Sequence, residues 1–285
     1  MQQWFYEYWT KNIRFGIKYK DHFLSKQTKF QKLDFYDSYE LGKFFTLDDV
    51  MMANEKDEFI YHEMMIHTPL AVHPAVKDVL VIGGGDGGSV RELTKYPTIQ
   101  TIDMVEIDED VVRACQKHFT ITAHKLTDPR VKLYFEDGLA FVKNSEKQYD
   151  LIVVDSTDPF GPGEGLFSME FYQNCYHILR QDGILVNQHE SPYFDNTKLE
   201  MSRAHKKITS IFPIATVYQA YIPTYPSGHW LFGFASKQYD PIKDFSPNVS
   251  LQASFGLKYY NTEIHKASFV LPNYVDKALQ DARNK

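Results

Sequence analysis

The chain has 285 residues, of which 43% are hydrophobic and 24% are charged, as is ordinary for a globular protein of one large or two smaller domains. Its net charge is 31 − 37 = −6. This argues against nucleic acid as a main partner, because phosphate binding needs a basic face. No apolar run reaches the length of a membrane span, and the first residues lack the basic and apolar regions of a signal peptide. We therefore expect a cytoplasmic protein that binds neither nucleic acid nor membrane.

Residues 1–60 have the character of β-strands. The stretch 4–9 is aromatic, and the stretches 13–19 and 32–38 alternate apolar and polar residues. Gly42 and the pair Asp48–Asp49 supply turn residues between short strands. We predict a small antiparallel N-terminal sheet with one aromatic face, covered either by a second subunit or by the rest of the chain.

A helical period begins at Glu58 and continues to Leu70. This segment leads into a second domain, and we place the boundary between residues 60 and 61. Tyr61 and His62 lie on the predicted helix. On pattern alone, the favoured interpretation of His62 is a surface histidine or one satisfied by neighbours.

From Val76 onward, apolar strands alternate with helical segments, which predicts a mostly parallel sheet covered on both faces. The last two strands have no long helix between them, which indicates an antiparallel final pair. We predict an α/β fold with a methyltransferase-like, seven-stranded sheet. The free thiols Cys115 and Cys175 lie in helical segments without metal-ligand spacing and are expected to be buried. The predicted strands are 79–82, 101–107, 131–135, 150–154, 183–188, 215–221 and 230–235, and the predicted helices are 89–95, 109–118, 138–144, 168–180, 197–211 and 275–283.

The chain is organised around the segment 79–90, in which four apolar residues precede a glycine-dense turn and a helix start. Gly83, Gly85 and Gly88 have the G-x-G-x-x-G spacing, which allows a backbone to approach an adenosine-type ligand at a helix N-terminus. Asp86 is unusual inside such a loop. Its carboxylate would repel a phosphate or a substrate carboxylate and would favour an amine.

Acidic residues follow the predicted strands at the edge where open α/β sheets bind ligands. Glu106 suits a carboxylate that accepts both ribose hydroxyls, and Asp137 with Gly138 suits an adenine contact. For Asp137 a helix N-cap explains the sequence equally well, and the two roles are compatible. After the fourth strand come Asp155 and Asp158, and a turn explains one of them but not both.

An acidic lining of this kind needs cations, because like charges repel. A metal is the simplest cation, but the acids and histidines show no known metal spacing and no P-loop lysine follows the glycines. We therefore expect no metal. An organic polycation is the alternative, with each ammonium paired to a carboxylate. Tyr61 and Tyr225 would flank its alkyl chain.

At this point the chain resembles the polyamine aminopropyltransferases, and most closely the spermidine synthases. The resemblance covers about residues 31–234, and it implies a small N-terminal β-domain on a methyltransferase-like domain and a homodimer or homotetramer. The matching motifs fall in the family's order: Asp57–Met64, Gly83–Gly88, Glu106–Asp108, Asp137–Gly138, Asp155–Pro159 and Tyr225–Gly228.

The resemblance implies transfer of an aminopropyl group from decarboxylated S-adenosylmethionine, a co-substrate, to putrescine, without a cofactor. It implies that Asp155 is the proton acceptor and that Asp86 binds the aminopropyl ammonium of the donor. The polyamine site would be lined by Tyr61, His62, Asp158, Gln188 and Tyr225, and the adenosyl part would be held by Gln31, Gly83, Gly85, Glu106, Ile107, Asp137, Gly138 and Pro162.

Several alternatives remain at this stage. His62 stands where eukaryotic relatives tend to carry glutamine, which leaves the detail of the acceptor site open but not the reaction. Acceptor length is set by the shape of the pocket, which the sequence does not fix, so agmatine, cadaverine and spermidine remain alternative acceptors. A dinucleotide-dependent oxidoreductase would share the glycine spacing but does not explain Asp86 or the paired aspartates. A non-catalytic polyamine-binding protein would not need Asp155. The loop 156–167 has the glycine and proline content of a lid.

Overall fold

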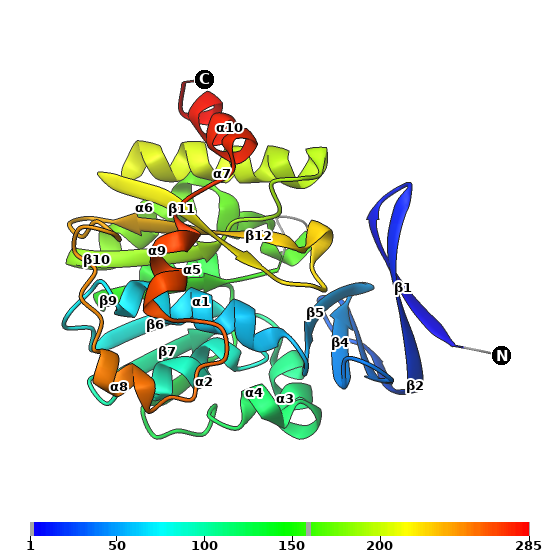
Figure 1. Cartoon of the computed structure of the whole chain (residues 1–285). Helices are drawn as coiled ribbons and strands as arrows, with labels where there is room; N and C mark the ends of the chain where they lie inside the picture. Colours follow the sequence, from blue (N-terminus) through cyan, green and yellow to red (C-terminus); the bar gives the residue numbers. More distant parts are fainter. Residues whose placement is uncertain (1–2, 158–160, 285) are drawn as a thin grey trace.

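Two β-sheets lie side by side in the computed structural model, which describes residues 3–157 and 161–284, without the side chains of residues 161 and 162 (Figure 1). The first sheet is antiparallel, with its strands in chain order, and confirms the predicted N-terminal sheet. Its strands are β1 (Trp4–Thr10), β2 (Ile13–Gln27), β3 (Lys32–Ser38), β4 (Lys43–Leu47) and β5 (Val50–Asn54). Strand β2 is much longer than the alternation over 13–19 indicated.

The second sheet has seven strands in the order β11-β12-β10-β9-β6-β7-β8. The five strands from β6 to β10 are parallel, and β12 runs antiparallel to both β10 and β11. This is the predicted mostly parallel, methyltransferase-like sheet. Its strands are β6 (Asp78–Gly83), β7 (Thr101–Val105), β8 (Val131–Tyr134), β9 (Tyr149–Asp155), β10 (Leu179–Gln188), β11 (Ile214–Tyr221) and β12 (His229–Ser236).

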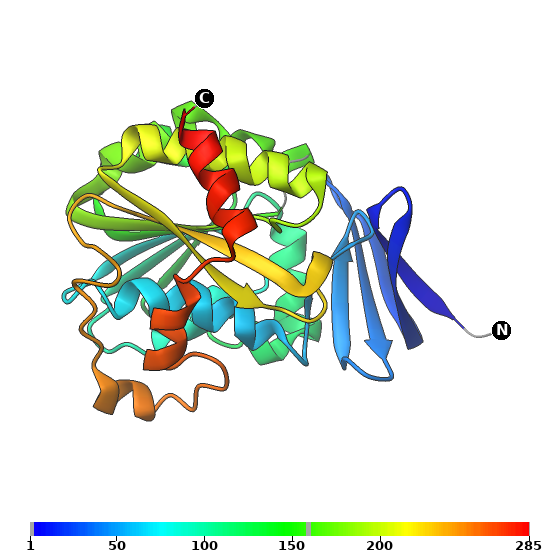
Figure 2. The same cartoon turned by 45° about the horizontal axis from the view of Figure 1, so that its top comes forward.

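Helices cover both faces of this sheet, and Figure 2 shows α1 and α7 on opposite sides. Val79 and Val81 of β6 pack toward the core shared with α1, whereas Leu80 and Ile82 pack toward α5, α6 and α7. The helices are α1 (Glu58–Leu70), α2 (Gly88–Thr94), α3 (Glu109–His118), α4 (Thr120–Ala123), α5 (Gly138–Asn144), α6 (Met169–Ile178), α7 (Asp195–Ile211), α8 (Val249–Ala253), α9 (Thr262–Ser268) and α10 (Asn273–Asn284), with short 3-10 turns η1 (Gly161–Phe167) and η2 (Pro226–Gly228).

Among the described residues, five short helices and turns were not predicted, namely α4, α8, α9, η1 and η2, because a segment of three to seven residues carries too little periodicity. The two cysteines are buried free thiols, as expected. The proposed domain boundary after residue 60 falls in the first turn of α1 and stays a prediction. In the described part of the chain, no helix combines the length and apolar character that crossing a bilayer requires.

The strand order changes direction between β6 and β9. From β6 the chain proceeds outward through β7 and β8, then returns to place β9 on the other side of β6. Ligands of open α/β sheets bind in the crevice that such a switch point leaves at the carboxyl ends of the strands. The register pairs Gly83 with Asp155 at that end, so the sheet brings the glycine loop and the predicted proton acceptor together.

The N-terminal sheet is docked beside this crevice. Thr28 Oγ1 donates to Asp108 Oδ2 at 2.7 Å, and Lys26 Nζ forms an exposed ion pair with Asp110 at 2.7 Å. Phe35 and Phe45 also belong to the buried core that includes α1. The small sheet therefore forms one wall of the crevice.

Candidate active site

One cavity opens at the carboxyl ends of β6, β7, β9 and β10, with the N-terminal sheet as its wall. It is lined by every predicted site residue whose side chain the structure describes: Gln31, Tyr61, His62, Gly83, Gly85, Asp86, Glu106, Ile107, Asp137, Gly138, Asp155, Gln188 and Tyr225. Asp158 lies outside the described residues, and so does the side chain of Pro162. The other predicted site residues therefore lie around one cavity.

The glycine loop passes close to the strand ends. Gly83 has φ = +81°, in the left-handed region that favours glycine, and a side chain there would meet the Asp155 backbone. Gly84 N donates to Asp155 O at 2.7 Å. A Cβ on Gly85 would lie 3.1 Å from Glu106 Oε2, and a Cβ on Gly88 would overlap the His62 ring. The spacing therefore serves close packing as well as the turn.

Asp155 ends β9, after the fully buried apolar run Leu151–Val154. Its carboxylate accepts hydrogen bonds from two hydroxyls, Tyr61 Oη to Oδ1 at 2.8 Å and Ser89 Oγ to Oδ2 at 2.7 Å. Burial raises the pKa of Asp155 above its ordinary value, against the opposing influence of His62. A carboxylate in this setting is a stronger base than the ordinary aspartate that the sequence alone would supply.

Asp86 and His62 face each other across the loop. Asp86 Oδ1 accepts from Gly88 N at 2.6 Å and lies 3.5 Å from His62 Nε2, while His62 Nδ1 lies 2.6 Å from Glu58 Oε2. Burial would lower the pKa of His62, but Asp86 and Glu58 outweigh it and raise that pKa well above its ordinary value. The His62 side chain is only 2% exposed, so a surface histidine is wrong, whereas the alternative, a histidine satisfied by its neighbours, is confirmed by the pairing on both sides.

Glu106 and Asp137 follow β7 and β8. Glu106 Oε1 accepts from Asp108 N at 3.0 Å, and burial raises the pKa of Glu106 to about 7. Asp137 accepts from Leu139 N at 2.8 Å and caps α5, which confirms the N-cap interpretation. It also lines the cavity, so the two roles considered for it remain compatible.

Three further predicted residues form the remaining walls. Gln31 Nε2 donates to Asp108 Oδ2 at 3.2 Å, which ties the small sheet to the N-terminus of α3. Gln188 Nε2 donates to Glu190 Oε1 at 3.2 Å. Tyr225 Oη donates to Met52 O at 2.9 Å, and the Tyr225 ring lies 5.9 Å from that of Tyr61. The two tyrosines therefore flank one part of the cavity, as the sequence analysis expected.

Comparison with known proteins agrees with this geometry. Residues 58–246 match the family model described as spermine/spermidine synthase domain, and residues 3–55 match the one described as spermidine synthase tetramerisation domain. The chain belongs to the spermine/spermidine synthase family. This membership confirms the resemblance noted in the sequence and favours aminopropyl transfer over the oxidoreductase alternative.

Relatives match over nearly the whole chain. The polyamine aminopropyltransferase of Clostridium beijerinckii is 58% identical over 96% of this chain and 97% of its own. That of Alkaliphilus oremlandii is 59% identical over 98% of this chain and 99% of its own. Among solved structures, a spermidine synthase in complex with the transition-state analogue AdoDATO is 41% identical and covers 98% of this chain and 95% of that chain, with a TM-score of 0.94. Spermidine synthase from Thermotoga maritima is 40% identical, with a TM-score of 0.91 and coverage of 98% and 94%.

Two acidic residues that line the cavity, Glu7 and Glu190, were not predicted from the sequence. Glu7 comes from β1, is 5% exposed and accepts from Met51 N at 2.9 Å. Glu190 follows β10, is 2% exposed and has φ = +70°. The alternation of β1 offered a signal for Glu7, because it places this charged residue opposite the exposed Tyr6 and Tyr8, on the buried face.

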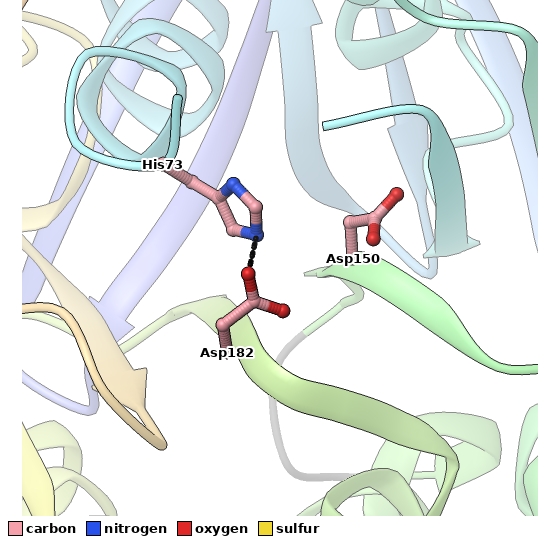
Figure 3. A group of neighbouring side chains, drawn as sticks. All are labelled: His73, Asp150 and Asp182. Carbon is pink, nitrogen blue, oxygen red and sulfur yellow. Dashed lines mark ion pairs between the residues drawn. The ribbon is translucent and has the colours of Figure 1, made fainter. Parts of the chain in front are cut away.

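A second group of histidine and carboxylates lies at the other end of the same strands (Figure 3). It consists of His73, Asp150 and Asp182, whose nearest ligand atoms lie within 4.8 Å of one another. Asp150 already accepts from Lys77 N, Asp78 N and Arg180 Nη1 at 2.6–2.8 Å. His73 Nδ1 accepts a hydrogen bond from Ala75 N at 3.2 Å. A histidine that binds a metal through Nε2 almost always donates a hydrogen bond from Nδ1 instead. These contacts fit a structural network, and the expectation of no metal stays a prediction.

Proposed function

We propose that this chain is a spermidine synthase, which transfers the aminopropyl group of decarboxylated S-adenosylmethionine to putrescine and releases spermidine and methylthioadenosine. The observation that carries the proposal is the convergence of Asp86, Glu106 and Asp155 on one cavity at the switch point of the sheet. Both substrates are cationic, so Asp86 and Asp155 provide opposite charges where they are needed, while Glu106 provides an acceptor for hydroxyl groups. The names of the relatives support the reaction class.

The chemistry follows from the charge of the donor. A sulfonium makes the adjacent carbon electrophilic, and the attacking amine nitrogen forms the new C–N bond as the C–S bond breaks. The electron pair of that bond goes to sulfur, which leaves as a neutral thioether, and one proton leaves the nitrogen. A free alkyl ammonium titrates near ~10, so the enzyme must supply the neutral amine.

Asp155 is the proposed acceptor of that proton. Tyr61 and Ser89 each donate to one of its oxygens, which fixes the plane of the carboxylate and leaves lone pairs for the amine. Its raised pKa makes it a better base. We expect positioning of the amine to contribute at least as much as proton transfer.

The other walls divide the substrates between them. Asp86 would bind the aminopropyl ammonium of the donor, and Glu106, at the end of β7, would accept the ribose hydroxyls. Asp137, Gly138, Ile107, Gln31, Gly83, Gly85 and Pro162 would surround the nucleoside. Tyr61, Tyr225, His62, Asp158 and Gln188 would line the polyamine path. Glu7 and Glu190 also line the cavity and would suit the distal ammonium of an acceptor such as putrescine.

We also propose that the protein is a homo-oligomer assembled through the N-terminal sheet. Trp4, Tyr6 and Tyr8 point to one face of β1 and are 43%, 39% and 65% exposed. An aromatic patch of this kind on an edge strand is typical of an interface. The match of residues 3–55 to a tetramerisation domain supports a second copy of this chain as the occupant. Sedimentation velocity of the wild type and of Tyr8→Lys distinguishes a dimer or tetramer from a monomer.

The proposed function is tested by incubating the purified protein with decarboxylated S-adenosylmethionine and, separately, putrescine, cadaverine, agmatine and spermidine. Mass spectrometry then identifies methylthioadenosine and the new amine. We expect spermidine to form with the highest kcat/KM. A higher value for another amine would replace putrescine as the acceptor, and no methylthioadenosine with any amine would reject the function in favour of a polyamine-binding protein.

A further inference from the structure

A buried line of alternating charges leads from the cavity into the space between α1 and α2. His62 and Asp86 line the cavity, whereas Glu58 and Arg91 are not among its lining residues. Glu58 and His62 are four residues apart on α1, so their side chains meet on one face of the helix. In order, the charged groups are Asp86, His62, Glu58, Arg91 and Glu92.

The His62 ring lies between two carboxylates. An ionised carboxylate accepts hydrogen bonds but cannot donate them. Nδ1 lies 2.6 Å from Glu58 Oε2, and Nε2 lies 3.5 Å from Asp86 Oδ1. A neutral imidazole carries a proton on one nitrogen only, whereas the imidazolium donates from both. The geometry therefore favours the imidazolium, whose orientation is set by its shorter contact, the one with Glu58.

Arg91 in turn holds Glu58. Its Nη1 and Nη2 donate to Oε1 and Oε2 of Glu58 at 2.8 and 3.0 Å, a bidentate pair. Arg91 Nε donates to Glu92 Oε1 at 2.8 Å. Because the Glu58 side chain is only 3% exposed, little solvent screens these contacts, and the carboxylate cannot turn away from His62 without breaking them.

We propose that Glu58 and Arg91 are positioning residues, which hold the His62 imidazolium against Asp86 and thereby hold the Asp86 carboxylate toward the donor. The inference rests on the proposed function, in which Asp86 binds the aminopropyl ammonium. An ammonium site of this kind contributes alike to the bound substrate and to the transition state. Loosening it should raise KM for the donor more than it lowers kcat.

The charges around His62 define the expected protonation. Glu58 faces it from its own helix, Asp86 from the glycine loop and Asp155 from β9, while Arg91 lies beyond Glu58. The two carboxylates in contact raise the pKa of His62 well above its ordinary value despite burial. Loss of the Glu58 charge lowers that pKa, so His62 should then lose its proton at a lower pH than in the wild type.

The experiment compares Glu58→Gln with the wild type in two assays. With wild-type activity established, we expect the variant to raise KM for decarboxylated S-adenosylmethionine about tenfold, with kcat within about threefold. Nitrogen-15 NMR of histidine side chains, assigned with His62→Gln and recorded over a series of pH values, reports the protonation of His62. We expect His62 to lose its proton at a lower pH in Glu58→Gln than in the wild type.

Asp103→Asn is the matched control. Asp103 is another buried carboxylate, paired with Lys147 Nζ at 2.8 Å on β7 and absent from the cavity lining. We expect this variant to lose stability but to keep the donor KM and the His62 signal. Arg91→Lys keeps the charge but not the bidentate pair, and it should raise the donor KM about threefold; it replaces Glu58→Gln if that variant does not fold.

An unchanged donor KM together with an unchanged titration of His62 in a folded variant would overturn the inference. The same holds if Asp103→Asn raises the donor KM as much as Glu58→Gln does. A wild type without turnover would instead reject the proposed function. The NMR comparison requires no substrate, so it would still test the protonation of His62 and its dependence on Glu58.

Discussion

Strand β9 carries an aspartate at each end, and the two residues have opposite environments. Asp150, near the amino end, is 4% exposed and accepts hydrogen bonds from two backbone amides and from the Arg180 guanidinium. Asp155, at the carboxyl end, borders the cavity, and the hydrogen bonds that the described chain gives its side chain come from two hydroxyls. Helix α1 runs beside the strand and places His62 at one end, while the following turn places His73 at the other.

The difference separates a carboxylate used for structure from one available for chemistry. The charge of Asp150 is matched within the chain, so its hydrogen bonds contribute to folding. Asp155 sits where burial disfavours its ionised form, which is unfavourable for the empty protein and useful once a cationic amine arrives. A histidine beside an aspartate is therefore a poor guide to function unless the remaining partners of both are known.

The comparison is tested most strongly by Asp155→Asn. The amide cannot accept the amine proton, so we expect kcat to fall about 10²–10⁴-fold, measured as the rate of methylthioadenosine release. Asp150→Asn, five residues earlier on the same strand, should keep kcat within about threefold. Similar losses in the two variants would show that the ends of β9 do not differ in role.

Much of this contrast could be predicted from the sequence, because the buried apolar runs of β6 and β9 are followed by the acidic residues Asp86 and Asp155. The run Leu151–Val154 predicts a buried strand, and its position after the helical segments predicts which end carries the site. That Asp150 pairs with Arg180 depends on the register between β9 and β10. Glu7 and Glu190 required the same kind of information, since the contact of Glu7 with Met51 spans 44 residues. Local patterns do not specify such long-range pairings.

For stability we expect the opposite ranking, with Asp150→Asn more damaging than Asp155→Asn. Asp150→Asn leaves Arg180 and two partly buried backbone amides with a weaker acceptor, and we expect the free energy of unfolding to fall by about 1–3 kcal/mol, seen as a Tm lowered by several degrees. Asp155 has a folded pKa raised above its unfolded value, so its ionisation destabilises the fold above that folded pKa, and the penalty disappears at acid pH. Asp155→Asn should therefore be at least as stable as the wild type at pH 8. Calorimetry checks both, and a large loss in Asp155→Asn would contradict the assignment.

Asp86 lies in the cavity, at the same end of the sheet as Asp155, and tests the role of charge there. Its charge should favour the decarboxylated donor and repel the carboxylate of intact S-adenosylmethionine. We expect Asp86→Asn to narrow the ratio of kcat/KM values for the two donors about tenfold, or about 1.4 kcal/mol. Competition assays with both donors measure this ratio, and an unchanged ratio would reject the selection role.

Glu106 gives the smallest expected effect, a pH dependence of donor binding. Burial raises its pKa to about 7, and only the ionised form accepts from both ribose hydroxyls. As pH falls through this pKa the carboxylate becomes protonated, so kcat/KM for the donor should drop about fivefold between pH 7 and pH 6. Glu106→Gln should have a lower kcat/KM that lacks this step. If kcat/KM of Glu106→Gln falls by the same factor between pH 7 and pH 6, the pH dependence belongs to another group.

The account depends most on Asp155 as the group that takes the proton from the amine, and one pH series tests that directly. The single-turnover rates of the wild type and of Asp155→Asn are compared from pH 7 to pH 9.5 at saturating donor and putrescine. Because the free amine titrates near ~10, it loses its proton to solvent more readily as pH rises. The ratio of wild-type to variant rate should therefore fall across the series, leaving only the part due to positioning. A ratio that stays constant over this range would contradict proton acceptance by Asp155.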